Sequence, residues 1–157
     1  MFSTDGASFR LAARDAARAL ARRPTGRRMA VHHGRVLHLS EVATLTRAAA
    51  GDSTSVRVVG TLVEFDLTTG GAVIQHCEAR LAVDASLLSG VSYQLGVLLE
   101  CIGELYWPDV AEDSPDDSLP AKPILRARIA RDASGRNMAL YERAMGSLRE
   151  FCAQEPS

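Results

Sequence analysis

Five short runs of alternating apolar and polar residues follow one another between residues 56 and 131, and an amphipathic helix pattern comes after them. Alternation with a period of two indicates β-strands with one buried face, whereas a repeat near 3.6 residues indicates a helix. This order of patterns restricts the chain to a small β-structure followed by a helix. With 157 residues, 46% of them hydrophobic, the chain can build one compact core.

The first and longest run, residues 56–68, changes phase near Gly60. Its apolar residues fall on even positions up to Leu62 and on odd positions from Val63 to Leu67. We expect a bulge and a bend near Gly60, because such a strand can serve both sides of a small barrel. The pair Gly70-Gly71 then predicts a hairpin turn.

The other strands are predicted at residues 72–78, 80–84, 97–107 and 124–131. In the fourth strand, the alternation directs Leu99 and Cys101 inward and Glu100 outward. In the fifth, it directs Leu125, Ala127 and Ile129 inward and Arg126 and Arg128 outward. Residues 35–42 also alternate and predict a short edge strand, residues 48–55 predict a loop, and residues 85–95 have mixed turn and helical character. The fold class is therefore mainly β: a five-stranded OB-fold barrel with a C-terminal α-helix and a basic helical N-terminal extension.

This organisation divides the chain into an arginine-rich N-terminal extension, residues 1–33, and an OB-fold domain with its C-terminal helix, residues 34–153. Residues 1–28 carry seven arginines against Asp5 and Asp15. The extension could be an arm that contacts phosphates, a solvated segment or a mitochondrial presequence. The proline-containing stretch 108–122 is acidic and predicts a long loop before the fifth strand.

The terminal helix is predicted over residues 137–153, with Asn137 as its N-cap. Its apolar positions cover about 160°, which is wider than the roughly 100° that packing against a single core requires. The excess indicates a second contact, with a partner protein. One stripe supplies the anchors that we expect for this contact: Met138, Tyr141, Met145, Leu148 and Cys152. Leu140, Ala144 and Phe151 form a second stripe beside it. The alternative is that both stripes close the open end of the barrel.

No catalytic or metal-binding pattern is present in the sequence. The four histidines have no cysteine or histidine at the spacing of a zinc site, and no P-loop, dinucleotide-binding or nucleophile-elbow motif occurs. We therefore expect a non-enzymatic protein without a metal or other cofactor. No apolar run approaches the roughly 20 residues that span a bilayer, so a membrane role is not expected.

OB-folds bind single-stranded nucleic acid with basic and aromatic side chains on the barrel face. The arginines predicted on this face are Arg57, Arg80, Arg126 and Arg128. They are candidates for nucleic-acid contacts, and the alternative is that they belong to solvated strand faces.

Several segments together resemble, in order and spacing, the smallest subunit of the CST telomere-capping complex, known as Ten-one. They are VLHLSEV at 36–42, RVVGTLVEFD at 57–66, GVLLECIGEL at 96–105, LRARI at 125–129 and GRNMALYERAM at 135–145. The resemblance covers residues 34–152, and the Gly-x-Asn-x-x-x-Tyr start of the helix is its most specific part.

The resemblance implies a non-enzymatic OB-fold subunit that pairs with the Stn subunit and, through it, with the large Ctc or Cdc-type subunit. The complex would bind single-stranded telomeric DNA in the nucleus, cap chromosome ends, limit telomerase and support C-strand fill-in by DNA polymerase alpha-primase. The five helix anchors named above would make the contact with Stn. Two alternatives are the small subunit of a replication protein A-like complex and a mitochondrial single-strand-binding protein.

Overall fold

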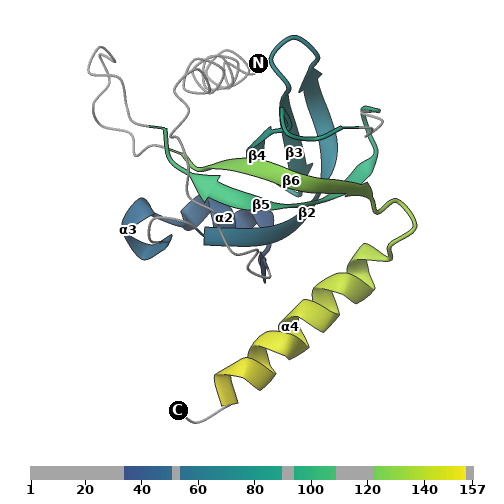
Figure 1. The fold of residues 1–157 in the computed structure, drawn as a ribbon. Coiled ribbons are helices and arrows are strands. Elements are labelled where there is room, and N and C mark those ends of the chain that lie inside the picture. The colour runs from purple at the N-terminus through teal and green to yellow at the C-terminus, as the bar shows by residue number, and fades with distance from the viewer. Residues whose placement is uncertain (1–33, 51–53, 90–93, 109–121, 155–157) are drawn as a thin grey trace, which may run out of the picture.

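The computed structural model describes residues 34–50, 54–89, 94–108 and 122–154. The predicted extension 1–33 and most of the acidic loop lie outside these residues. The described elements, in chain order, are β1 (Arg35–Val36), α2 (Leu39–Thr44), α3 (Arg47–Ala50), β2 (Thr54–Asp66), β3 (Gly71–His76), β4 (Ala79–Asp84), β5 (Leu98–Tyr106), β6 (Ile124–Asp132) and α4 (Met138–Gln154) (Figure 1).

The five strands β2 to β6 close into a barrel, because β2 is long enough to pair with two neighbours. Its residues from Thr54 to Thr61 pair with β5, and from Thr61 onward it pairs with β3. The ring continues from β3 to β4, then to β6 through a parallel pairing, and returns to β5. The predicted five-stranded OB-type barrel with a terminal helix is confirmed, and β1 adds a short parallel strand beside β2.

The predicted bulge in β2 is displaced from its expected position. The register against β3 shifts between Leu62 and Glu64, not at Gly60, and Leu67, which was expected to face inward, is 88% exposed. Gly60 has a different role: a Cβ there would lie 2.9 Å from Leu39 Cδ1 and 3.1 Å from Ile74 Cβ. The glycine therefore lets α2 approach the strand closely.

A second bulge corrects the prediction for β6. Ile102 pairs with Ile129, but the next residue of β5, Gly103, pairs with Ala127, which leaves Arg128 as the extra residue. An inserted residue reverses the alternation beyond it. Ala127 is consequently buried, whereas Ile129, which was predicted to face inward, is 50% exposed.

The segment 35–42 is not the single edge strand that its alternation predicted. Only Arg35 and Val36 form β1, and α2 begins at Leu39. The N–H of His38 donates to the Glu41 carboxylate at 2.7 Å and so caps the helix. Leu39 and Val42, three residues apart on one face of α2, are buried in the core.

Two predicted connections also differ from the structure. The expected loop 48–55 contains the end of α3 and the start of β2. In the segment 85–95, the described residues 85–89 and 94–95 form turns and no helix. The core itself follows the predicted strand faces, and Leu62, Ile74, Leu105 and Leu125 are among its fully buried side chains.

Candidate functional site

Helix α4 leaves the barrel after a short connection from β6 and runs away from it as a separate rod (Figure 1). Asn137 caps it as predicted, because its Oδ1 accepts a hydrogen bond from the N–H of Leu140 at 3.1 Å. The side chain thereby satisfies one of the N–H groups that a helix start leaves without an intrahelical partner. The helix spans Met138–Gln154, one residue later at each end than predicted.

Few contacts join α4 to the barrel. Met145 is 5% exposed and is the buried residue of the helix. Two polar contacts join the helix to the barrel: a hydrogen bond between Glu142 Oε1 and His76 Nε2 at 2.7 Å, and an ion pair between Arg149 Nη2 and Glu41 Oε2 at 2.5 Å. Because these contacts are largely exposed, each contributes at most about 1 kcal/mol. The helix is thus positioned by its buried methionine and its first turn more than by these contacts.

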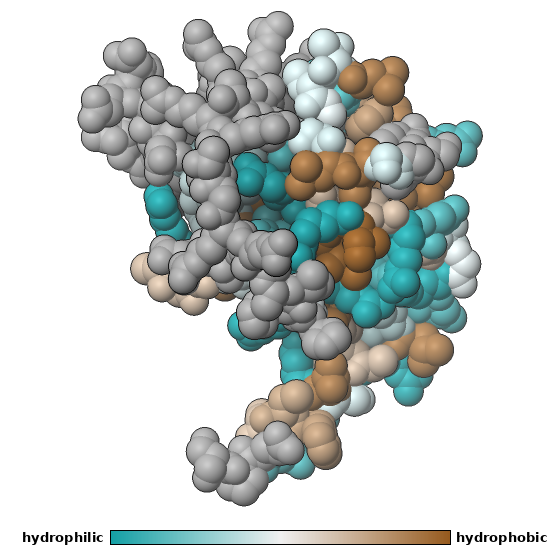
Figure 2. Space-filling model, in the orientation of Figure 1, coloured by the Kyte–Doolittle hydropathy of each residue, from teal (hydrophilic) through white to brown (hydrophobic). Residues whose placement is uncertain are grey.

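The side of α4 that faces away from the barrel carries a row of apolar side chains, which we call the seam. Its exposed members at spacings of three and four residues are Leu140, Ala144, Leu148 and Phe151. Exposed Cys152 lies at the edge of the seam, because it is seven residues after Met145 and so points nearly the same way as that buried residue. Leu140, Leu148 and Phe151 are 61%, 50% and 65% exposed. Apolar colour accordingly runs along the projecting helix in the space-filling view (Figure 2).

The five anchors expected from the sequence are divided between two environments. Leu148 belongs to the seam and Cys152 to its edge, Met138 and Tyr141 are half-buried, and Met145 is buried within this chain. The second stripe, Leu140, Ala144 and Phe151, supplies most of the seam. The sequence contained both stripes, but only the structure shows which of them the barrel covers.

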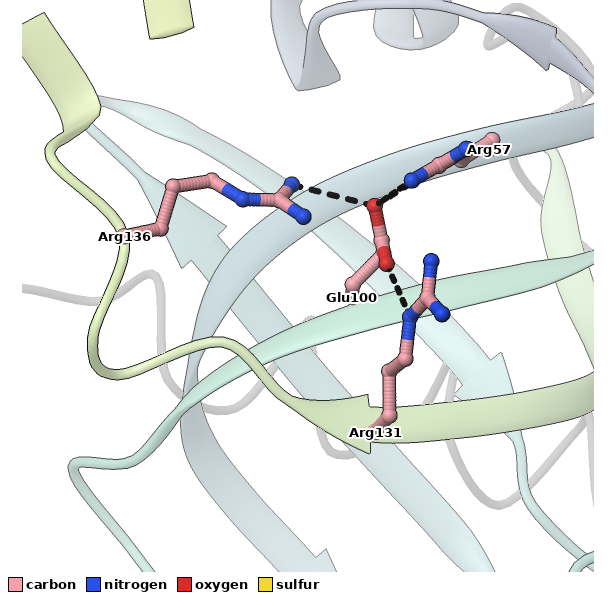
Figure 3. Close-up of polar contacts among 4 residues, drawn as sticks. All are labelled: Arg57, Glu100, Arg131 and Arg136. Carbon is pink, nitrogen blue, oxygen red and sulfur yellow. Dashed lines mark hydrogen bonds and ion pairs between the residues drawn. The ribbon is translucent and has the colours of Figure 1, made fainter. Parts of the chain in front are cut away.

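A cluster of charged residues that the sequence did not predict lies at the root of α4. Glu100, expected on a solvated strand face, is fully buried beneath three arginines: Arg57, Arg131 and Arg136 (Figure 3). We call this group the arginine clasp. Arg57 comes from β2, Arg131 from β6 and Arg136 from the connection to α4, so one carboxylate links two strands to the base of the helix.

The geometry of the clasp is that of charge-assisted hydrogen bonds. Glu100 Oε1 accepts from Arg57 Nε at 2.7 Å and from Arg136 Nη1 at 3.0 Å, and Oε2 accepts from Arg131 Nε. Burial raises the pKa of Glu100, but the hydrogen bonds from the three arginines outweigh it and lower the pKa to about 2. Glu100 is therefore ionised at neutral pH.

Tyr141 continues the clasp into the first turns of α4. The guanidinium of Arg136 lies 5.1 Å from the centre of its ring, a cation–π distance. Burial raises the pKa of the Tyr141 hydroxyl, whose oxygen is buried and has no hydrogen-bond partner within the described residues. One sequence signal could have pointed to the clasp, because Glu100 interrupts an otherwise apolar strand. In the structure Arg131 is its direct cross-strand neighbour.

Each of the four arginines predicted to contact nucleic acid has a carboxylate partner within its own chain. The pairs and their N–O distances are Arg57–Glu100 at 2.6 Å, Arg80–Glu64 at 3.7 Å, Arg126–Asp84 at 3.4 Å and Arg128–Glu104 at 3.5 Å. Arg126 also lies 4.8 Å from the centre of the Tyr106 ring. The four residues come from β2, β4 and β6. Arg80, Arg126 and Arg128 are each paired with a carboxylate, whereas Arg57 shares Glu100 with Arg131 and Arg136, so positive charge that a phosphate backbone could use remains at the clasp.

The described residues contain no group of three or more His, Cys, Asp and Glu side chains that could hold a metal ion. Within the same ranges, none of the helices is both long and apolar enough to cross a membrane.

Three comparisons agree with this architecture. Residues 30–155 match the family model described as telomere-capping, CST complex subunit. The CST complex subunit TEN1 of Arabidopsis thaliana is 28% identical over 104 residues, which are 66% of this chain and 75% of that protein.

Two solved structures from S. pombe share the fold. A chain of the Stn1–Ten1 complex superposes with a TM-score of 0.57 at 18% identity, covering 78% of this chain and 97% of that one. The telomere-capping protein Ten1 gives a TM-score of 0.56 at 17% identity, covering 76% and 100%. Since the family model spans most of the sequence, including the barrel, the clasp and α4, this chain belongs to the family of telomere-capping CST complex subunits.

Proposed function

We propose that this chain pairs with an Stn1 subunit and that the outward side of α4 makes the central contact. The observation that carries the proposal is the seam, a row of exposed apolar side chains on a helix that has Met145 as its buried residue. A contiguous apolar surface of this kind marks an interaction site. One of the S. pombe structures with the same fold was solved as an Stn1–Ten1 complex, which supports this choice of partner.

The five anchors expected from the sequence have different roles in this proposal. Leu148 and Cys152 contact the partner together with Leu140 and Phe151, and Met138 and Tyr141 contact it at the edge of the seam. Met145 positions the helix from the barrel side, because it is already buried there. Burying the exposed parts of Leu140, Leu148 and Phe151 would contribute about 1 to 2 kcal/mol each to a helix-to-helix contact.

As a member of its family the chain is a non-catalytic subunit, so it acts by assembly. We propose that, through Stn1, it joins the large Ctc or Cdc-type subunit at telomeres in the nucleus. Binding of single-stranded telomeric DNA, limitation of telomerase and support of DNA polymerase alpha-primase are assigned to the complex. Direct DNA contact by Arg57, Arg80, Arg126 and Arg128 stays a prediction. It is weakened for Arg80, Arg126 and Arg128 by the carboxylate beside each of them, whereas Arg57 shares Glu100 with Arg131 and Arg136.

The test is co-purification of the chain with the Stn1 protein of the same organism. The double variant Leu148→Arg with Phe151→Arg should lose the partner, because it places two charges in an apolar interface. Ala153→Arg is the control: it adds one positive charge on the other side of the helix, and it should retain the partner. Circular dichroism should show that both variants remain folded. Retention of Stn1 by the folded double variant would refute the assignment of the seam.

The replication protein A alternative differs in its partner and not in its fold. A middle subunit of replication protein A, offered in the same co-purification, should not bind. The match to the CST family, at residues 30–155, supports Stn1 over that partner.

A further inference from the structure

The seam has two features that a docking surface for an unrelated partner does not require. Residues seven apart on α4 lie on almost the same side of the helix, because seven residues make nearly two turns. One such pair, Ala144 and Phe151, joins the smallest and the largest side chain of the seam. The other pair, Arg143 and Glu150, joins opposite charges along the polar edge of the seam.

The charges of Arg143 and Glu150 are unused within the described part of the chain. Glu142 and Arg149, their neighbours on the barrel side, contact His76 and Glu41, whereas Arg143 and Glu150 form no ion pair there. Both residues are exposed. They are therefore available to a second helix that lies along the seam.

From these pairs we infer that two copies of this chain associate through their seams in antiparallel orientation. In this orientation Phe151 of each copy packs over Ala144 of the other, a large side chain over a small one. Arg143 of each copy faces Glu150 of the other. The first pairing centres the two-fold axis midway between residues 144 and 151, and the second centres it midway between 143 and 150. The two centres differ by a single residue, so one dimer satisfies both.

A parallel arrangement lacks this complementarity. It would place two alanines opposite each other, which leaves a void. It would also turn the polar edge of each seam toward the opposite edge of the other seam, so that Arg143 and Glu150 do not meet. The antiparallel dimer also places the two barrels at opposite ends of the helix pair. The contact is a single helix pair, at the small end of specific interfaces, so we expect a dissociation constant on the order of 10 µM.

Self-association depends on the seam alone, but its consequence rests on the proposed function. If Stn1 uses the same seam, the homodimer and the heterodimer exclude each other. The chain then keeps its apolar surface covered until its partner displaces the second copy.

The first test is sedimentation of the purified full chain across a concentration series. The wild-type chain should shift from monomer to dimer. Arg143→Glu alone and Glu150→Arg alone should each weaken the dimer at least about 10-fold, because each places like charges opposite one another. The double variant Arg143→Glu with Glu150→Arg should return to within about 3-fold of wild type, since it restores opposite charges in exchanged positions. A wild-type chain that stays monomeric, or a double variant that is no stronger than the single ones, would overturn the inference.

Cross-linking tests the orientation. In a background with Cys77→Ser and Cys152→Ser, the double variant Ala144→Cys with Phe151→Cys should form a covalent dimer on mild oxidation. Ala144→Cys alone should not, because equivalent positions of the antiparallel pair lie about 10 Å apart along the axis, beyond disulfide reach. Covalent dimers from Ala144→Cys alone would indicate a parallel pair and overturn the inference.

Addition of Stn1 separates this inference from the proposed function. If both hold, Stn1 should convert the homodimer into a heterodimer. Heterodimer formation by a chain that is monomeric on its own would refute only self-association. A stable homodimer that ignores Stn1 would refute only the proposed function.

Discussion

Replacement of Glu100 by glutamine tests the arginine clasp directly. The amide has nearly the same shape as the carboxylate but no charge, so Arg57, Arg131 and Arg136 would converge on a neutral group. Burial raises the pKa of Glu100 and the three arginine bonds lower it, with a net fall from 4.5 to about 2. A difference of this size corresponds to a contribution on the order of 3 kcal/mol from the ionised form.

This contribution has a defined pH dependence. Because the folded-state pKa is depressed, the stabilisation is fully present above pH 4.5 and is lost as the pH falls toward 2. Wild type should therefore exceed Glu100→Gln in free energy of unfolding by about 2 to 3 kcal/mol at pH 7, and by only about 1 kcal/mol at pH 3. Urea denaturation of both proteins at the two pH values measures the difference.

Glu104→Gln is the matched control on the same strand. Glu104 is 25% exposed and lies 3.5 Å from a single arginine, Arg128. Its replacement should cost less than about 1 kcal/mol at pH 7. A Glu100→Gln penalty below 1 kcal/mol, or one of equal size at pH 7 and pH 3, would refute the account of the clasp.

Substitutions at three further positions test arguments about the local backbone and the helix cap. Gly103→Ala should cost more than about 4 kcal/mol or abolish folding, because the added Cβ would lie 2.0 Å from the carbonyl oxygen of Arg126. Gly146→Ala, in the open middle of α4, should instead stabilise by about 0.5 to 1 kcal/mol, and thermal unfolding compares the two. Asn137→Ala should cost about 1 kcal/mol by removing the cap of α4, visible as faster hydrogen exchange in its first turn, whereas Asn137→Asp should not.

The barrel was predictable from sequence because its strands obey a local rule. Alternation placed Leu99, Cys101, Leu105 and Leu125 on the buried face, and all four are buried. The rule failed where a bulge inserts a residue, as at Arg128, since the extra residue is visible only when two strands are set side by side. Ile129 was misplaced for this reason.

The candidate site was predictable only in part, because it depends on contacts between distant segments. The surplus of apolar residues on α4 could be recognised from the sequence, but the covered side could not, since that depends on how the helix leaves the barrel. Glu100 appeared to be a solvated residue because its strand position faces outward. Its burial comes from Arg57 and Arg131, which lie 43 and 31 residues away in the sequence, and from Arg136 at the base of α4.

The way α4 is mounted has a consequence for assembly. The helix has 17 residues, which at 1.5 Å per residue make a lever about 25 Å long, so a tilt of about 10° at its base moves the far end by about 4 Å. Phe151 lies near that far end and the clasp lies at the base. A small change in the residues joining β6 to α4 would therefore produce a larger displacement at the far end of the helix. Related subunits could change the orientation of a bound partner in this way without altering the barrel.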